Sequence, residues 1–244
     1  MASNKEELPY NLVLVFKTGL AVPQNPTAFF DTYNNILEGD KTTLKARPSL
    51  GASLYFDLYD KYRIDISGSY MFADLNDFYT DQIYNSHGEI TYRYITSDIF
   101  IKEFPVILNI LYMPFRDYQY KTYIGIGAGI SIGSIEWSEI INSPIPRDDR
   151  QGGEQYNDFF IRPAAKLTTG LELAFDKNFR ALFLGSLIIE VNYGLIFTGV
   201  DVFKNVSPQF DDQPSLEDRY NLFPGYLSFT AGVSFNLGGY SNLP

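Results

Sequence analysis

The 244-residue chain has no cysteine and one histidine, His87. The lack of cysteine excludes disulfides and thiolate metal sites, although it does not identify a compartment. No apolar run reaches the roughly 18 residues that a membrane helix needs, so helical membrane spans are excluded. Residues 1–8 contain no apolar signal segment, so export of this chain requires that a signal peptide has been removed.

The chain is nevertheless rich in aromatic residues, at 16%, and has only 20% charged residues. Such a composition is not that of a disordered chain, so much of the chain must be buried or embedded. The segment 226–237 alternates strictly between apolar residues and small polar ones. One face therefore suits lipid and the other a tightly filled polar interior, which is typical of a transmembrane β-strand.

The alternation recurs along the chain in eight segments. They are 12–20, 47–58, 62–72, 103–112, 120–133, 161–175, 182–197 and 226–237. The fourth segment is the least regular, because it is apolar on both sides and Pro105 removes a ladder donor. The fifth places glycines on its inner face, which leaves room for bulky side chains, and its expected register sets Ile107 opposite Gly125.

The connections between these segments are alternately long and short. The short ones are 59–61, 113–119 and 176–180, and the long ones are 22–46, 74–88, 134–158 and 200–220. The pattern predicts an all-β fold: an eight-stranded antiparallel up-and-down transmembrane β-barrel with short periplasmic turns and long extracellular loops. Residues 1–244 form a single domain in this prediction, with the barrel at about 9–238 and a short C-terminal tail.

Three segments resemble a known group of proteins. Residues 102–109, 123–129 and 229–237 are similar to strands of the small eight-stranded bacterial outer-membrane barrels, the broad group of the OmpX, OmpA-transmembrane, OmpW and PagP families and the generic outer-membrane β-barrel domain. The resemblance implies a bacterial outer-membrane location, contact with membrane lipid and lipopolysaccharide, and a C-terminal signal read by the barrel-insertion machinery. The tail 238–244 departs from barrels that end at the last aromatic residue.

Charged residues fall at inward positions of the predicted strands and nearly balance, six basic against five acidic. They are Lys17, Arg47, Asp57, Arg63, Asp65, Glu103, Lys121, Arg162, Lys166, Glu172 and Glu190. We expect a paired structural network in a narrow lumen, because unpaired buried charge is costly. A charged lining of a selective pore is the alternative. The short turns predict two cross-strand pairs, Asp57 with Arg63 and, if Phe175 faces Ala181, Lys166 with Glu190.

The four long segments carry a combined charge of −11 in a chain of net charge −10, so the acidity is expected outside the barrel. Four acidic residues lie around Gly152 and Gly153: Asp148, Asp149, Glu154 and Asp158. One hypothesis is that they bind calcium, which prefers clustered oxygen ligands. Their spacing matches no EF-hand, so a solvated loop is favoured. No cofactor and no nucleic-acid partner are expected.

Aromatic residues suggest membrane-interface girdles, with ordinary hairpin packing as the alternative. The set near the short turns is Tyr10, Tyr59, Tyr62, Tyr112, Tyr118 and Tyr120, and the opposite set is Tyr70, Phe72, Trp137 and Tyr226. The alternation also predicts that arginine at outward Ile126 or Leu171 is costly, whereas serine at inward Gly170 is mild.

The preferred functional hypothesis is a non-enzymatic structural or interaction scaffold that presents acidic surface loops to a protein partner. The alternative is a narrow channel or lateral-exit transporter for small or hydrophobic molecules, although eight strands leave little interior space. An outer-membrane enzyme is a remote alternative, resting on His87 beside Ser86 or on the pair Asp211 and Asp212. A soluble lipocalin-like carrier would need the reverse polarity, with apolar residues inside.

Overall fold

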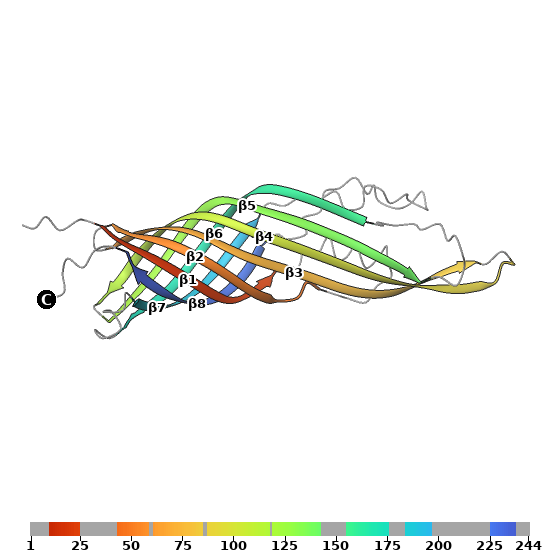
Figure 1. Cartoon of the computed structure of the whole chain (residues 1–244), viewed down its shortest axis with the longest axis horizontal. Helices are drawn as coiled ribbons and strands as arrows, with labels where there is room; N and C mark the ends of the chain where they lie inside the picture. The colour runs from red at the N-terminus through yellow and green to blue at the C-terminus, as the bar shows by residue number, and fades with distance from the viewer. Residues whose placement is uncertain are drawn as a thin grey trace, which may run out of the picture.

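The computed structural model describes residues 10–24, 43–58, 61–84, 87–117, 119–142, 155–175, 184–196 and 225–237. These residues form eight antiparallel strands that close into a barrel in sequence order (Figure 1). The strands are β1 Tyr10–Pro23, β2 Arg47–Leu58, β3 Tyr62–Tyr84, β4 Ile90–Arg116, β5 Tyr120–Asn142, β6 Gln155–Ala174, β7 Leu184–Ile196 and β8 Gly225–Asn236. The predicted up-and-down barrel is confirmed. Within the described part of the chain, no helix has the length and apolar character to span a membrane.

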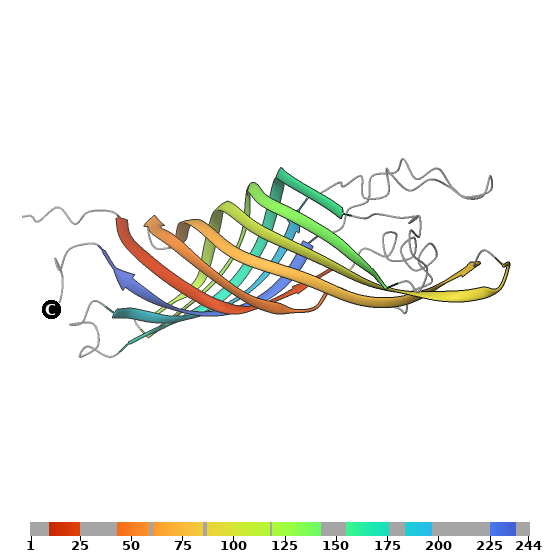
Figure 2. The ribbon, with the colours of Figure 1, turned by 45° about the vertical axis from the view of Figure 1, so that its right-hand side comes forward.

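The strands differ greatly in length. Strands β3, β4 and β5 continue well past the ends of β1, β2, β7 and β8, and the β3–β4 hairpin projects furthest (Figures 1 and 2). The prediction of loops at 74–88 and 134–158 is therefore wrong for 74–84, 134–142 and 155–158, which form strands, whereas 85–86 and 143–154 lie outside the described residues. Beyond Asp74 the outward positions become partly polar, as at Asn76 and Thr80, so the lipid-facing pattern ends although the pairing does not.

The predicted inner and outer faces are confirmed for the described strands. Outward Ile126 and Leu50 are 69% and 61% exposed, whereas inward Val15, Tyr55 and Arg63 are fully buried. The irregular segment in β4 follows the same rule, with its glutamate, proline and asparagine directed inward. The barrel thus has an apolar exterior and a filled interior.

An apolar band girdles the barrel between two aromatic levels. Tyr62 and Tyr112 mark the short-turn level with ring centroids 5.7 Å apart, and Tyr120 is also exposed there. Phe72 and Phe100 contact each other at the opposite level. A strand rises about 3.3 Å per residue and tilts by about 40° in such barrels, so Tyr62 to Phe72 covers about 25 Å, the height of an outer-membrane apolar band.

The girdle prediction is only partly right. Tyr70 is exposed and adjoins Phe72, as expected, with ring centroids 6.4 Å apart. Trp137 and Tyr226 are instead buried inside the barrel, and the Trp137 indole nitrogen donates a hydrogen bond to Ser97 Oγ at 2.8 Å. Each of them alternates with the outward residues of its own strand and therefore lies on the inner face. The side chains of Tyr10, Tyr59 and Tyr118 lie outside the described residues.

A polar belt, defined as Asp74, Asn76, Asp98, Lys102 and Glu136, follows the second aromatic level on the outer face. Lys102 Nζ contacts Glu136 Oε1 at 2.8 Å, and Asn76 donates a hydrogen bond to Asp98. Charged side chains of this kind are unfavourable in the hydrocarbon region of a bilayer. The belt therefore marks the boundary of the membrane, and the strand segments 77–84, 90–97 and 137–142 extend beyond it as a protruding sheet.

The pairing of β6 with β7 differs from the prediction. Lys166 lies opposite Gly194 and Glu190 lies opposite Gly170, so the predicted Lys166–Glu190 cross-strand pair is wrong. The predicted turn 176–180 lies outside the described residues. The described part of β6 ends at Ala174 and that of β7 begins at Leu184, and the register is displaced by four positions from the predicted one. Because this displacement is even, both side chains still occupy the inner face.

The pairing of β4 with β5 is displaced as well, since only residues 117–119 connect these strands. Ile107 lies opposite Gly129 rather than Gly125, whose partner is Leu111. Large side chains nevertheless still face glycines, as the sequence predicted.

A tyrosine ring covers Gly170. Gly170 lies opposite Tyr123, and a Cβ atom at this glycine would lie 2.4 Å from the Tyr123 ring. Serine at Gly170 must displace a buried ring, so the prediction of a mild effect is wrong.

Candidate functional site

An ion-pair cluster fills the lumen near the short turns. The fully buried Arg63 binds Asp57 and contacts Glu172, with 2.9 Å between Arg63 Nη2 and Glu172 Oε2. Lys121 Nζ lies 3.1 Å from Glu172 Oε1 and 3.8 Å from Asp57 Oδ2. Asp57 and Arg63 are direct cross-strand partners, which confirms the first predicted pair. Arg116 also approaches Asp57, at 3.9 Å.

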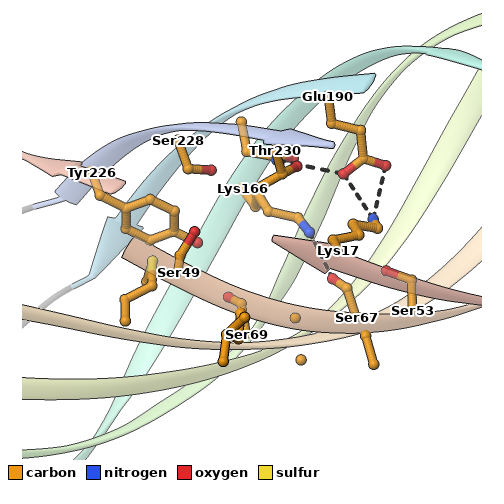
Figure 3. Close-up of a pocket in the computed structure, with 16 residues that line it drawn as sticks. Lys17, Ser49, Ser53, Ser67, Ser69, Lys166, Glu190, Tyr226, Ser228 and Thr230 are labelled. Atoms are coloured by element: carbon orange, nitrogen blue, oxygen red, sulfur yellow. Dashed lines mark hydrogen bonds and ion pairs between the residues drawn. The ribbon is translucent and has the colours of Figure 1, made fainter. Parts of the chain in front are cut away.

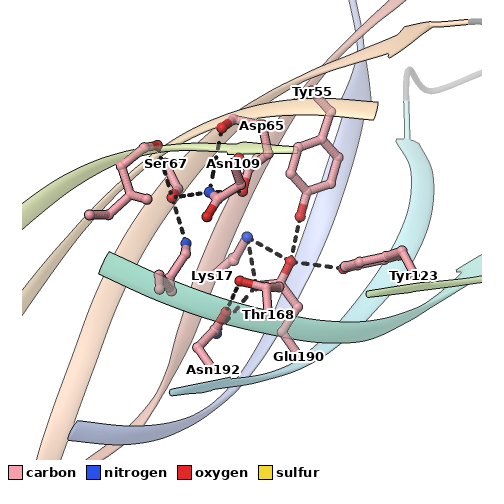
Figure 4. A network of polar contacts seen from close by, with 11 residues as sticks. Lys17, Tyr55, Asp65, Ser67, Asn109, Tyr123, Thr168, Glu190 and Asn192 are labelled. Carbon is pink, nitrogen blue, oxygen red and sulfur yellow. Dashed lines mark hydrogen bonds and ion pairs between the residues drawn. The ribbon is translucent and has the colours of Figure 1, made fainter. Parts of the chain in front are cut away.

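Glu190 is the centre of the next layer (Figure 4). Lys17 Nζ contacts both of its carboxylate oxygens, at 2.8 Å and 2.7 Å. The hydroxyls of Tyr55 and Tyr123 donate to Glu190 Oε1 at 2.5 Å and 2.8 Å, and Asn192 donates to Oε2 at 3.5 Å. Lys17, Tyr55 and Tyr123 belong to three other strands, β1, β2 and β5, whereas Asn192 belongs to β7 itself. The carboxylate therefore joins strands that are not neighbours, and its acceptor capacity is filled.

A third layer contains Asp65, Asn109 and Ser67 (Figure 4), together with Lys166. Asn109 Nδ2 donates to Asp65 Oδ2 at 2.8 Å and to Ser67 Oγ at 3.1 Å. Lys166 Nζ donates to the same Ser67 hydroxyl at 2.6 Å. The three layers occupy the barrel interior with paired or hydrogen-bonded polar groups.

Apolar side chains fill the lumen on the side of the protruding sheet. This apolar plug comprises Ala21, Leu44, Met71, Ala73, Leu75, Ile99, Ile101, Ile107, Ile135, Trp137, Phe160, Ala164, Ile196 and Tyr226. The expectation of a polar interior therefore holds only for the short-turn side. Sequence reasoning missed the plug because several of its members lie in segments that were taken as loops.

Of the eleven residues in the predicted charge network, six form ion pairs within this set: Lys17, Asp57, Arg63, Lys121, Glu172 and Glu190. Arg47 is not part of the lumen, because it pairs with Asp74 at the belt. Glu103 is buried and accepts a hydrogen bond from Ser131, but no lysine or arginine of the described residues lies within salt-bridge distance. Arg162 is half-buried in β6 opposite Ser131.

The protruding sheet carries a second apolar surface, here called the outer patch: Phe78, Ile90, Tyr92, Tyr94 and Ile140. These side chains are between 47% and 59% exposed. The rings of Phe78 and Tyr94 are stacked, with centroids 5.9 Å apart. The polar belt separates this patch from the lipid-facing band. Aromatic side chains are enriched at protein interfaces, so the patch is a candidate binding surface.

The residues considered for catalysis and metal binding are not brought together where they are described. His87 is exposed at the tip of the β3–β4 hairpin, beside Gly88 with φ 78°. Ser86, Asp148, Asp149, Glu154, Asp211 and Asp212 lie outside the described residues. Asp158 belongs to β6. In the part of the chain that is described, no three histidine, aspartate or glutamate side chains are grouped to hold a metal ion.

Comparison with known proteins finds similarity only at the level of solved structures. No protein-family model and no curated protein sequence matches the chain. Neisserial surface protein A aligns with a TM-score of 0.44 and 9% identity, covering 94% of this chain and 98% of that protein. Ail, the attachment invasion locus protein of Yersinia pestis, aligns with a TM-score of 0.35 and 11% identity, covering 93% of this chain and 97% of that protein.

Proposed function

We propose that this protein is a non-enzymatic outer-membrane barrel that binds a macromolecular partner through its protruding sheet. The observation that carries the proposal is the outer patch, which stands beyond the polar belt and exposes large apolar side chains to water. A patch of this kind on a soluble surface is a typical mark of an interaction site. The binding surface that we propose is therefore an uncharged aromatic face, in place of the acidic loops that the sequence suggested.

The filled lumen supports a scaffold rather than a transporter. The ion-pair cluster and the Glu190 layer occupy one side and the apolar plug the other. An eight-stranded barrel has room for side chains and little else. The alternative of a narrow channel requires these groups to move, and a lateral exit requires an opening in a barrel whose described strands are each paired with both neighbours.

The proposed environment is the bacterial outer membrane. The apolar band has the height of that bilayer, and the belt lies at the expected depth for contact with lipid or lipopolysaccharide headgroups. Insertion by the barrel-assembly machinery is part of the same proposal.

Photo-crosslinking tests the binding surface directly. Benzoylphenylalanine at position 94 retains an aromatic ring, and irradiation of intact cells of the source organism is expected to give a discrete adduct. The additional change Phe78→Ser removes the stacked ring and should reduce the adduct strongly. The same probe at position 126, on the lipid face, is the control and should give no such band. Equal adducts from both positions, or none from position 94, would overturn the proposed surface.

A further inference from the structure

A small cavity lies in the lumen between the Glu190 layer and the apolar plug (Figure 3). Its volume is about 30 Å³, and Met71 and Tyr226 of the plug form part of its wall. Hydroxyl side chains line much of the remainder: Ser49, Ser53, Ser67, Ser69, Ser228 and Thr230. A space of this size holds about one or two particles as large as water.

The cavity wall presents hydrogen-bond donors without matching acceptors. Lys166 has three N–H donors, but within the described chain its ammonium group makes one hydrogen bond, to Ser67 Oγ at 2.6 Å. The hydroxyls of Ser49 and Thr230 are buried without a hydrogen-bond partner in the described structure. Ser49 is only 3% exposed, so bulk water does not supply the missing partner. A buried polar group without a partner is unfavourable.

The charges of the wall favour a negative occupant. Lys17, Lys166 and Glu190 are the charged residues that line the cavity, so the wall carries a net positive charge. Lys17 already binds Glu190, whose oxygens accept hydrogen bonds from Tyr55, Tyr123 and Asn192 as well. Asp65 does not line the cavity and accepts a hydrogen bond from Asn109. Asp65 attracts Lys166 from beyond the cavity wall but lies outside salt-bridge distance. Among the described residues, Lys166 is therefore the lining charge that has no direct ion-pair partner.

We propose that this cavity is a binding site for one small inorganic anion of the halide class, held by Lys166 and the surrounding hydroxyls. The anion accepts the spare N–H donors of Lys166 together with the hydroxyl protons of Ser49 and Thr230. It thereby compensates the lysine charge within the lumen and stabilises the packing of the plug above it. A halide ion is larger than one water molecule, and a cavity with room for one or two waters can hold one such ion.

Crystals of the detergent-purified protein grown in sodium bromide test the site by anomalous diffraction at the bromine edge. We expect an anomalous peak in the cavity, within hydrogen-bond distance of Lys166 Nζ. A cavity that contains only water, with no anomalous signal, would overturn the proposal.

Unfolding in solution provides a second readout. The urea midpoint of the wild-type protein should rise when bromide replaces gluconate at constant ionic strength, because a ligand bound only by the folded state stabilises it. Lys166→Met should abolish this rise, and Ser49→Ala, a smaller change, should weaken it. Lys102→Met, at the outer belt, should leave it intact. A bromide response that is absent in the wild-type protein, or unchanged in Lys166→Met, contradicts the anion site.

Discussion

Replacing Arg63 with methionine should lower the free energy of unfolding by about 3 to 5 kcal/mol, the usual effect of removing one partner of a buried ion pair. Arg63 is fully buried and is the shared partner of Asp57 and Glu172. Without it, two carboxylates remain in the lumen with only Lys121 and the more distant Arg116 to compensate them. Urea unfolding in lipid vesicles measures the change.

A double-mutant cycle separates this pairing from a general packing effect. Arg63→Met combined with Asp57→Asn should cost less than the sum of the two single changes, with a coupling energy of about 0.5 to 3 kcal/mol. Arg47→Met is the matched control, because its pair with Asp74 is partly exposed at the belt and should contribute at most about 1 kcal/mol. Additive effects of Arg63 and Asp57 would contradict the buried cluster.

The second large effect is expected from arginine on the outer face of β5. Ile126→Arg should destabilise the barrel by about 2 to 4 kcal/mol, because Ile126 is 69% exposed on the lipid-facing band between Tyr120 and the polar belt. Ile140→Arg changes the same residue type on the same strand and face, but beyond the belt. It should alter the free energy of unfolding by no more than about 0.5 kcal/mol.

In lipid vesicles, the difference between the two variants in free energy of unfolding reports where along β5 the membrane ends. Similar losses at both positions would place the protruding sheet in the bilayer. If arginine were tolerated equally well at both positions, neither part of the outer face of β5 would contact the hydrocarbon region of the bilayer. Either result contradicts the assignment of the belt as the membrane boundary.

The sequence was sufficient to predict which face of each strand is buried. Side chains alternate with a period of two, so even the irregular segment of β4 could be oriented from its few polar residues, such as Asn109. The register of neighbouring strands was harder to predict. It depends on the length of each connection, and the residue pattern does not show accurately where a strand ends. The short connection expected at 59–61 predicted the Asp57–Arg63 pair correctly. The turn expected at 176–180 did not predict the pairing of β6 with β7, in which Lys166 lies opposite Gly194 and not opposite Glu190.

The candidate site was predictable in composition but not in its contacts. The inward charges of the lumen followed from the alternation, yet the partner of Glu190 is Lys17 of β1, which is separated from β7 by β8 and is not on a neighbouring strand. The outer patch was missed for a different reason. The strand segments that carry the patch have polar residues at outward positions near the belt. The lipid-facing alternation used to recognise strands therefore stops at the belt. The backbone pairing of β3 with β4 nevertheless continues to Tyr84 and Ile90.

Single-channel recording in planar bilayers tests most directly the central claim, that the barrel is closed inside and functions through its outer surface. Co-flotation with lipid vesicles and proteolysis of the protruding sheet first establish that the protein has inserted in one orientation. The account predicts no stepwise current, because the Arg63 cluster, the Glu190 layer and the apolar plug occupy the lumen. Reproducible ion-conducting steps from the inserted wild-type protein would contradict it.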